Sequence, residues 1–147
     1  MKMLKKFTLV ILISLINFIN TNASENLFEK AKKNFEKKDY DKSKFLFQRN
    51  IVFNPKNAES YLYLAKIFKT EENQEEEEKN LDTTLLLEPN NEEAIYMLIN
   101  IQLDRSNFDK ANTLMDRFTS VCKKMCNKKI EISKSLQDIE ANNEKTN

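Results

Sequence analysis

The 147-residue chain contains no glycine, no histidine and no tryptophan, and it has only two prolines. Tight β-hairpin turns depend on glycine, so its absence argues against a β-rich chain and for an all-helical one. Without histidine the chain lacks the commonest general base and a common metal ligand. Without glycine it lacks every glycine-rich phosphate loop. We therefore expect no enzyme, no cofactor and no metal site.

The chain also lacks a large excess of either charge, since 24 basic and 23 acidic residues leave a net charge of +1. The basic residues are interleaved with acidic ones rather than gathered into a patch. A protein that binds nucleic acid normally carries such a patch, so no nucleic-acid partner is predicted.

The amino terminus differs from the rest of the chain. Three lysines within the first six residues precede the apolar run Phe7–Ile19, and small side chains follow at Thr21 and Ala23. This pattern is typical of a secretory signal peptide cleaved after Ala23. The alternative is an uncleaved inner-membrane anchor, although the run is shorter than the ~20 residues that span a bilayer. We expect a periplasmic or secreted protein that meets the membrane only through this segment, before cleavage.

The remaining sequence repeats with a period of 34 residues. Pro55 and Pro89 are 34 residues apart, as are Tyr40, Gln74 and Phe108. Each period holds two segments with helical spacing of apolar residues, which predicts an all-α solenoid built from helix pairs. The predicted units are a signal peptide (1–23), three repeats (24–57, 58–91 and 92–125), a capping helix (126–141) and a disordered tail (142–147).

Helix starts follow the same period. Good N-cap residues precede each predicted helix of the three repeats: Ser24, Asp39, Asn57, Asn73, Asn91 and Asn107. In the first repeat, the helices are predicted at Glu25–Lys37 and Tyr40–Phe53. After the third repeat, Ile132, Leu136 and Ile139 form the apolar face of the capping helix.

These residues resemble the tetratricopeptide repeat (TPR). The second repeat has Tyr61, Leu64, Ala65 and Pro89, the first has Ala31, Asp39-Tyr40, Phe47 and Pro55, and the third has Leu98, Asn107-Phe108 and Ala111. Two departures stand out. The turn position that is usually glycine is Lys38, Glu72 or Ser106, so we expect looser turns. The small residue early in the second helix is Ser43 or Ala111 in two repeats but Glu77 in the middle one.

Glu77 belongs to the run Glu75–Glu78. Carboxylates favour the positive end of a helix dipole, so a solvated helix start is the first interpretation of this run. The alternative is an acidic patch for a basic partner or for calcium, although no EF-hand spacing supports a calcium loop.

The resemblance implies a concave groove lined by the first helix of each repeat. The corresponding positions are Phe28, Lys32, Phe35, Leu62, Lys66, Lys69, Tyr96, Asn100 and Leu103. Aromatic side chains beside lysines and an asparagine suit a peptide groove. Alternatively, Phe28, Phe35 and Tyr96 only pack between repeats.

Cys122 and Cys126 are the only cysteines. In an exported chain an even number favours a disulfide, and this one requires the helix to bend or end between them. Two reduced cysteines, a thiol-redox pair and half of a metal site are the alternatives. The pair, followed by a capping helix, loosely resembles small exported bacterial TPR proteins.

The resemblance implies a non-catalytic interaction module of the bacterial periplasm or cell envelope, whose partner is a protein or peptide. A membrane-anchored assembly factor and a thiol-redox or metal-linked accessory protein are the other hypotheses.

Overall fold

The computed structural model describes residues 26–144, with side chains described to residue 137. The predicted signal peptide, the predicted cap Ser24 and residues 145–147 lie outside the described residues. A first helix at residues 26–36 is followed by α2 (Tyr40–Phe53), α3 (Ala58–Thr70), α4 (Gln74–Leu87), α5 (Glu92–Asp104), α6 (Phe108–Val121) and α7 (Lys128–Glu144). No strand occurs between residues 26 and 144.

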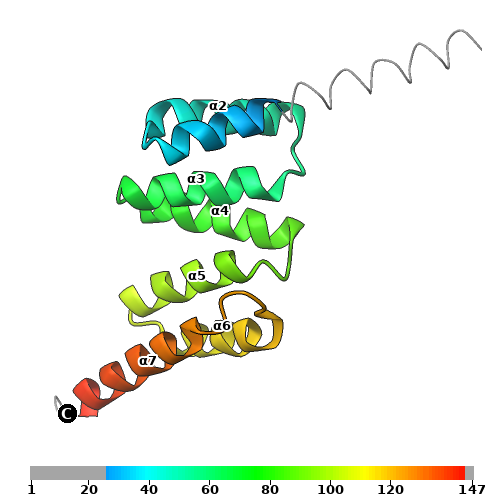
Figure 1. Cartoon of the computed structure of the whole chain (residues 1–147). Helices are drawn as coiled ribbons and strands as arrows, with labels where there is room; N and C mark the ends of the chain where they lie inside the picture. Colours follow the sequence, from blue (N-terminus) through cyan, green and yellow to red (C-terminus); the bar gives the residue numbers. More distant parts are fainter. Residues whose placement is uncertain (1–25, 145–147) are drawn as a thin grey trace, which may run out of the picture.

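The helices stack in chain order, as Figure 1 shows, with α2 at one end and α7 at the other. The closest helix packing is within the pairs α3–α4 and α5–α6, while α2 packs on α3 and α4 on α5. The capping helix α7 contacts both helices of the last pair. This nearest-neighbour packing is that of an α-solenoid, so the predicted all-α class and helix-pair architecture are confirmed.

The helix bounds agree closely with those expected from the sequence, except at both ends of the capping helix. It begins at Lys128 rather than at residue 126, because the disulfide loop precedes it. The first helix ends at residue 36 rather than at Lys37. α2 spans Tyr40–Phe53 as predicted, but α7 continues to Glu144, so residues 142–144 are helical rather than disordered. No glycine or proline follows Ala141 that would end the helix there.

Asparagine and aspartate side chains cap the helix starts as predicted. Asp39, Asn57, Asn73, Asn91 and Asn107 each accept a hydrogen bond from the backbone N–H three residues later. Each bond pairs a donor that the helix leaves without a partner, which fixes where the helix begins.

The turns within the repeats are not loose, contrary to the expectation from their missing glycines. Lys38, Glu72 and Ser106 adopt left-handed backbone conformation, with φ of 61°, 57° and 55°. Each turn also makes both hydrogen bonds of a Schellman motif; after α5, Ser106 N–H donates to Leu103 O and Asn107 N–H donates to Gln102 O. These bonds hold the residues in a conformation that glycine would adopt at lower cost.

The core consists of two apolar clusters. The first repeat and α3 supply Phe28, Ala31, Phe47, Leu64 and Ile67. The larger cluster runs from α3 to α7 and includes Ile132 and Leu136 of α7 together with Leu114 and Phe118 of α6. Ile132 and Leu136, two residues of the predicted apolar face, therefore close the end of the solenoid, while the third, Ile139, lies outside the described side chains.

The interpretation of the acidic run as a solvated helix start is wrong for Glu77. Its side chain is only 5% exposed. It stands where Ser43 and Ala111 are buried in the other repeats, because the helical face, and not the residue type, decides what points inward. Burial raises the pKa of this carboxyl, Lys69 opposes the rise and Asp104 adds to it.

Candidate functional site: the concave groove

The first helices of the three repeats line a cavity of about 370 Å³. We call it the groove cavity, and its walls are formed by Phe35, Lys66, Lys69, Thr70, Glu93, Tyr96, Met97 and Met125. Four of the predicted groove residues, Phe35, Lys66, Lys69 and Tyr96, therefore come together on one surface. The cavity combines apolar side chains with two ammonium groups, which can bind an apolar anchor beside a carboxylate.

Two of these wall residues are held in place by specific contacts. Lys66 forms an ion pair of 2.8 Å with Glu93, and its ammonium lies 4.8 Å from the ring centre of Tyr63. The Tyr96 hydroxyl donates to a carboxylate oxygen of Glu131 in α7 at 2.7 Å. These contacts fix the side chains before any partner arrives, which reduces the entropy lost on binding.

Lys69 differs from Lys66, since it makes no ion pair within residues 26–137 and its side chain is exposed. Its charge acts on the buried Glu77, whose pKa it lowers against the effect of burial. Lys69 is thus the wall residue best placed to pair with an acidic group of a partner.

The structure corrects the prediction for Phe28. Its side chain is 8% exposed and packs edge-to-face on Phe47 and Tyr63, with ring centres 5.7 Å and 6.0 Å apart. Phe28 is thus a core residue, because its helical face turns toward α2 and α3. For this residue the alternative of packing between repeats is correct.

The other predicted residues do not form walls of the groove cavity. Leu62 is 6% exposed and belongs to the core, with its edge on a neighbouring cavity described below. Lys32, Asn100 and Leu103 are half-buried. Leu103 also packs against the larger apolar cluster.

A second cavity, of about 630 Å³, adjoins the first. We call it the loop cavity, because Lys123, Lys124 and Met125 of the loop between α6 and α7 form one side of it. Its remaining walls are Glu59, Leu62, Glu92, Glu93 and the α4–α5 turn at residues 88–91. Glu93 and Met125 line both cavities, so the two cavities adjoin at these residues, and we call them together the hollow.

A disulfide closes this loop. Cys122 and Cys126 are bonded, with their Cα atoms 5.3 Å apart, which confirms the predicted pair. As the bond requires, the helix ends: α6 stops at Val121 and α7 begins at Lys128. Within the described residues no cluster of three or more potential ligands could hold a metal ion.

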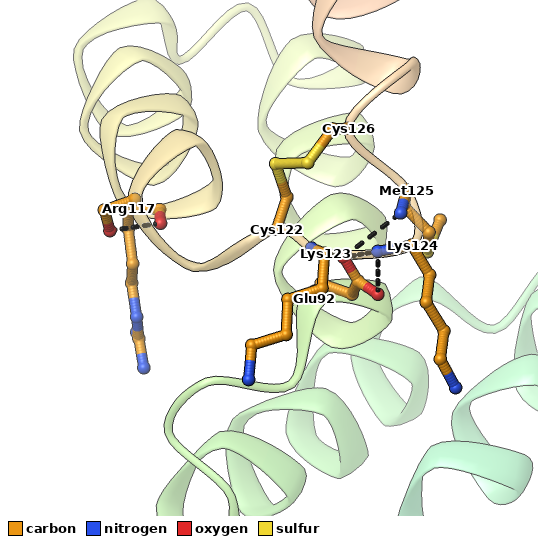
Figure 2. Close-up of a disulfide and its surroundings, with 8 residues drawn as sticks. Glu92, Arg117, Cys122, Lys123, Lys124, Met125 and Cys126 are labelled. Carbon is orange, nitrogen blue, oxygen red and sulfur yellow. Dashed lines mark hydrogen bonds between the residues drawn. A yellow bond between two sulfur atoms is a disulfide. The ribbon is translucent and has the colours of Figure 1, made fainter.

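Glu92, the first residue of α5, binds the same loop (Figure 2). Its carboxylate accepts the backbone N–H groups of Lys123 at 2.7 Å, Lys124 at 3.0 Å and Met125 at 3.2 Å. Desolvation acts to raise the pKa of Glu92, but the three hydrogen bonds outweigh it and lower that pKa. The carboxylate therefore stays ionised and bound to the loop at neutral pH.

Sequence reasoning missed several wall residues. Thr70 and Glu93 lie one helical turn from the predicted Lys66 and Tyr96, so helical spacing could have identified them. Glu92 and Met125 gave no such signal, because their role depends on a loop whose path the period does not describe.

In residues 26–144, no helix combines the length and the apolarity needed to cross a membrane.

No family model and no curated protein matches the sequence. Solved structures do match it. One is the type III secretion translocator chaperone SycD of Yersinia enterocolitica, with a TM-score of 0.74, 13% identity, and coverage of 90% of this chain and 93% of that one. The chain has the fold of a TPR domain.

Two further structures with this TPR fold contain peptides. SycD in complex with a peptide of the translocator YopD matches with a TM-score of 0.71, 12% identity, and coverage of 83% and 95%. The first TPR of Spaghetti (RPAP3) bound to an HSP90 peptide matches with a TM-score of 0.66 and 16% identity, and the match covers 78% of this chain and 93% of that one. By their descriptions, these structures are chaperones or TPR domains.

Proposed function

We propose that this protein is a non-catalytic interaction module that binds a peptide segment or a helix of a partner protein in the concave hollow. The observation that carries the proposal is the groove cavity, to which the first helices of all three repeats contribute walls. The peptide complexes of SycD and Spaghetti, which share the fold, support it.

The chemistry of the walls indicates what such a segment contains. Phe35, Tyr96 and Met97 offer an apolar surface, and Lys69 offers a charge without an ion pair within residues 26–137. A segment with one apolar anchor next to an acidic residue would satisfy both features.

Selection of peptides from a random library displayed on phage tests this proposal. The full-length chain, purified in oxidised form, serves as bait, and the best peptide is labelled with fluorescein for anisotropy measurements. Tyr96→Ala and Lys69→Glu should each raise its Kd about tenfold or more, the usual effect of losing an anchor or a complementary charge. Phe45→Ala and Lys42→Glu are the controls, since both side chains are exposed on α2 away from the hollow. Peptides that bind equally to all four variants would contradict groove binding.

We also propose that the chain is exported to the bacterial periplasm or cell envelope. The signal-peptide pattern of Met1–Ala23 and the pairing of the only two cysteines support this location. Cell fractionation followed by amino-terminal sequencing tests it. A start at Ser24 in the envelope fraction is expected, a start at Met1 in the membrane would favour the anchored alternative, and a cytoplasmic product would refute export.

A further inference from the structure

We infer that the loop Lys123–Met125 is a fixed wall of the partner-binding groove, in which Met125 contacts the partner and Glu92 is a positioning residue. The inference rests on the proposed function, because it assigns a role within that same groove. It adds a partner-contacting surface that lies outside the three helix pairs.

Two kinds of bond hold the loop in place: the disulfide and the hydrogen bonds to Glu92. We call them the two fastenings of the loop. The disulfide joins its ends, Cys122 and Cys126. The Glu92 carboxylate binds its middle through three backbone N–H groups, and Figure 2 shows both fastenings around the same short segment. Hydrogen bonds to an ionised carboxylate are stronger than neutral ones, so the loop is attached to the start of α5 and not only to its own ends.

The attachment matters because of where the loop lies. Met125 lines both the groove cavity and the loop cavity, and of the other wall residues only Glu93 does the same. Glu93 directly follows Glu92 at the start of α5 and forms the ion pair with Lys66. The fastened loop therefore borders the hollow at the point where its two parts meet, and releasing it would alter both.

The side chain of Met125 suits contact with an apolar group. A thioether is polarisable and has several rotatable bonds, so it can adapt to apolar side chains of different shape. Met125 shares the groove cavity with Tyr96 and Met97. The partner segment accordingly places an apolar side chain between α5 and the loop, within reach of Met125.

The first experiment tests the fastening without a partner. Methyl-¹³C methionine labelling of the full-length chain places NMR probes at Met125 and Met97 in the groove, with Met115 of α6 as an internal control. Dithiothreitol reduces the disulfide, giving two electrons and two protons to form two thiols while it closes into its own cyclic disulfide. Reduction and Glu92→Gln should each shift or broaden the Met125 signal and leave the Met115 signal in place. An unchanged Met125 signal in both would overturn the fastened loop.

The second experiment tests the contact with the partner. The probe is the fluorescein-labelled peptide selected on the oxidised chain, as above. Met125→Ala should raise its Kd about tenfold. Glu92→Gln should raise it by a smaller factor, because the Glu92 carboxylate is bound to the loop N–H groups and Met125 makes the proposed contact. Ile130→Ala and Glu75→Gln are the matched controls: Ile130 is 78% exposed, and Glu75 is a first-turn glutamate of α4 that holds no loop.

The outcomes separate the two proposals. If Tyr96→Ala lowers the affinity for the peptide but Met125→Ala does not, the groove binds the partner and the loop is not its wall. That result overturns this inference alone. If neither variant weakens the peptide, the proposed function fails and this inference fails with it. Loss of affinity in Met125→Ala and in Glu92→Gln, with both controls unchanged and thermal melting preserved, would support both.

Discussion

Replacing the three left-handed turn residues by glycine should stabilise the protein. Lys38, Glu72 and Ser106 hold φ near +60°, which costs a side-chain-bearing residue roughly 1–2 kcal/mol. Glycine removes this cost but has more freedom to lose on folding, roughly 0.5–1 kcal/mol. The net gain is therefore about 0.5–1 kcal/mol for each site. Because the sites are far apart in the sequence and lie in separate turns, the gains should add to about 2 kcal/mol in the triple variant.

Urea unfolding followed by circular dichroism measures these changes, and thermal melting gives an independent check. One kcal/mol corresponds to roughly 3–6 °C in Tm for a chain of this size. Gln48→Gly is the control, since Gln48 is an exposed residue in the interior of α2. The control should destabilise the chain by about 0.5–1 kcal/mol, because glycine weakens a helix interior.

Two results would refute this reasoning. The first is a loss of stability in all three single glycine variants, which would mean that the turns do not hold left-handed conformation in solution. The second is an equal effect of glycine at the turns and at Gln48, which would mean that backbone conformation is not the cause.

Two carboxylates give pH-dependent predictions, both measured by urea unfolding between pH 3 and 7. Glu77→Gln should stabilise the chain by about 0.5–1 kcal/mol at pH 7. The folded pKa of Glu77 lies above its usual 4.5, so the wild type loses stability as pH rises above 4.5, and the gain should vanish at low pH. Glu78→Gln should destabilise by about 1 kcal/mol at pH 7. Burial opposes the effect, but Arg105 and Lys110 lower the pKa of Glu78, so its contribution is present above pH 4.5 and is lost as pH falls through the lowered pKa. If the free energy of unfolding, relative to the wild type, changed with pH in the same direction in both variants, the opposite pKa shifts assigned to Glu77 and Glu78 would be wrong.

The features that the sequence predicts well are local. A cap such as Asn73 acts on a backbone group three residues away, and apolar residues one helical turn apart lie on one helical face. The 34-residue period repeats these signals, so the bounds of α2 and the stacking order followed from pattern alone. The groove residues Lys66 and Tyr96 came from the resemblance to the TPR family, and the period alone does not locate them: Phe28, which is equivalent to Tyr96, lies in the core.

Glu77 shows where residue type misleads. Its position is 34 residues from both Ser43 and Ala111, so the period already placed it on the inner face of α4. The run of four glutamates suggested a solvated helix start, since carboxylates are seldom buried. Here position in the repeat outweighs residue type, and the cost appears as a raised pKa.

The contact between Glu92 and the loop could not be inferred from the sequence for a different reason. Its donors are backbone N–H groups 31 to 33 residues away, and such groups carry no residue identity. A solenoid needs something to cover its last repeat, and α7 does so with Ile132 and Leu136. The chain must reverse between α6 and α7 to place that helix, and the reversal lies beside the start of α5. Closing the solenoid thus brings Met125 to the edge of the concave hollow, so the segment that ends the fold also completes the surface proposed to bind the partner.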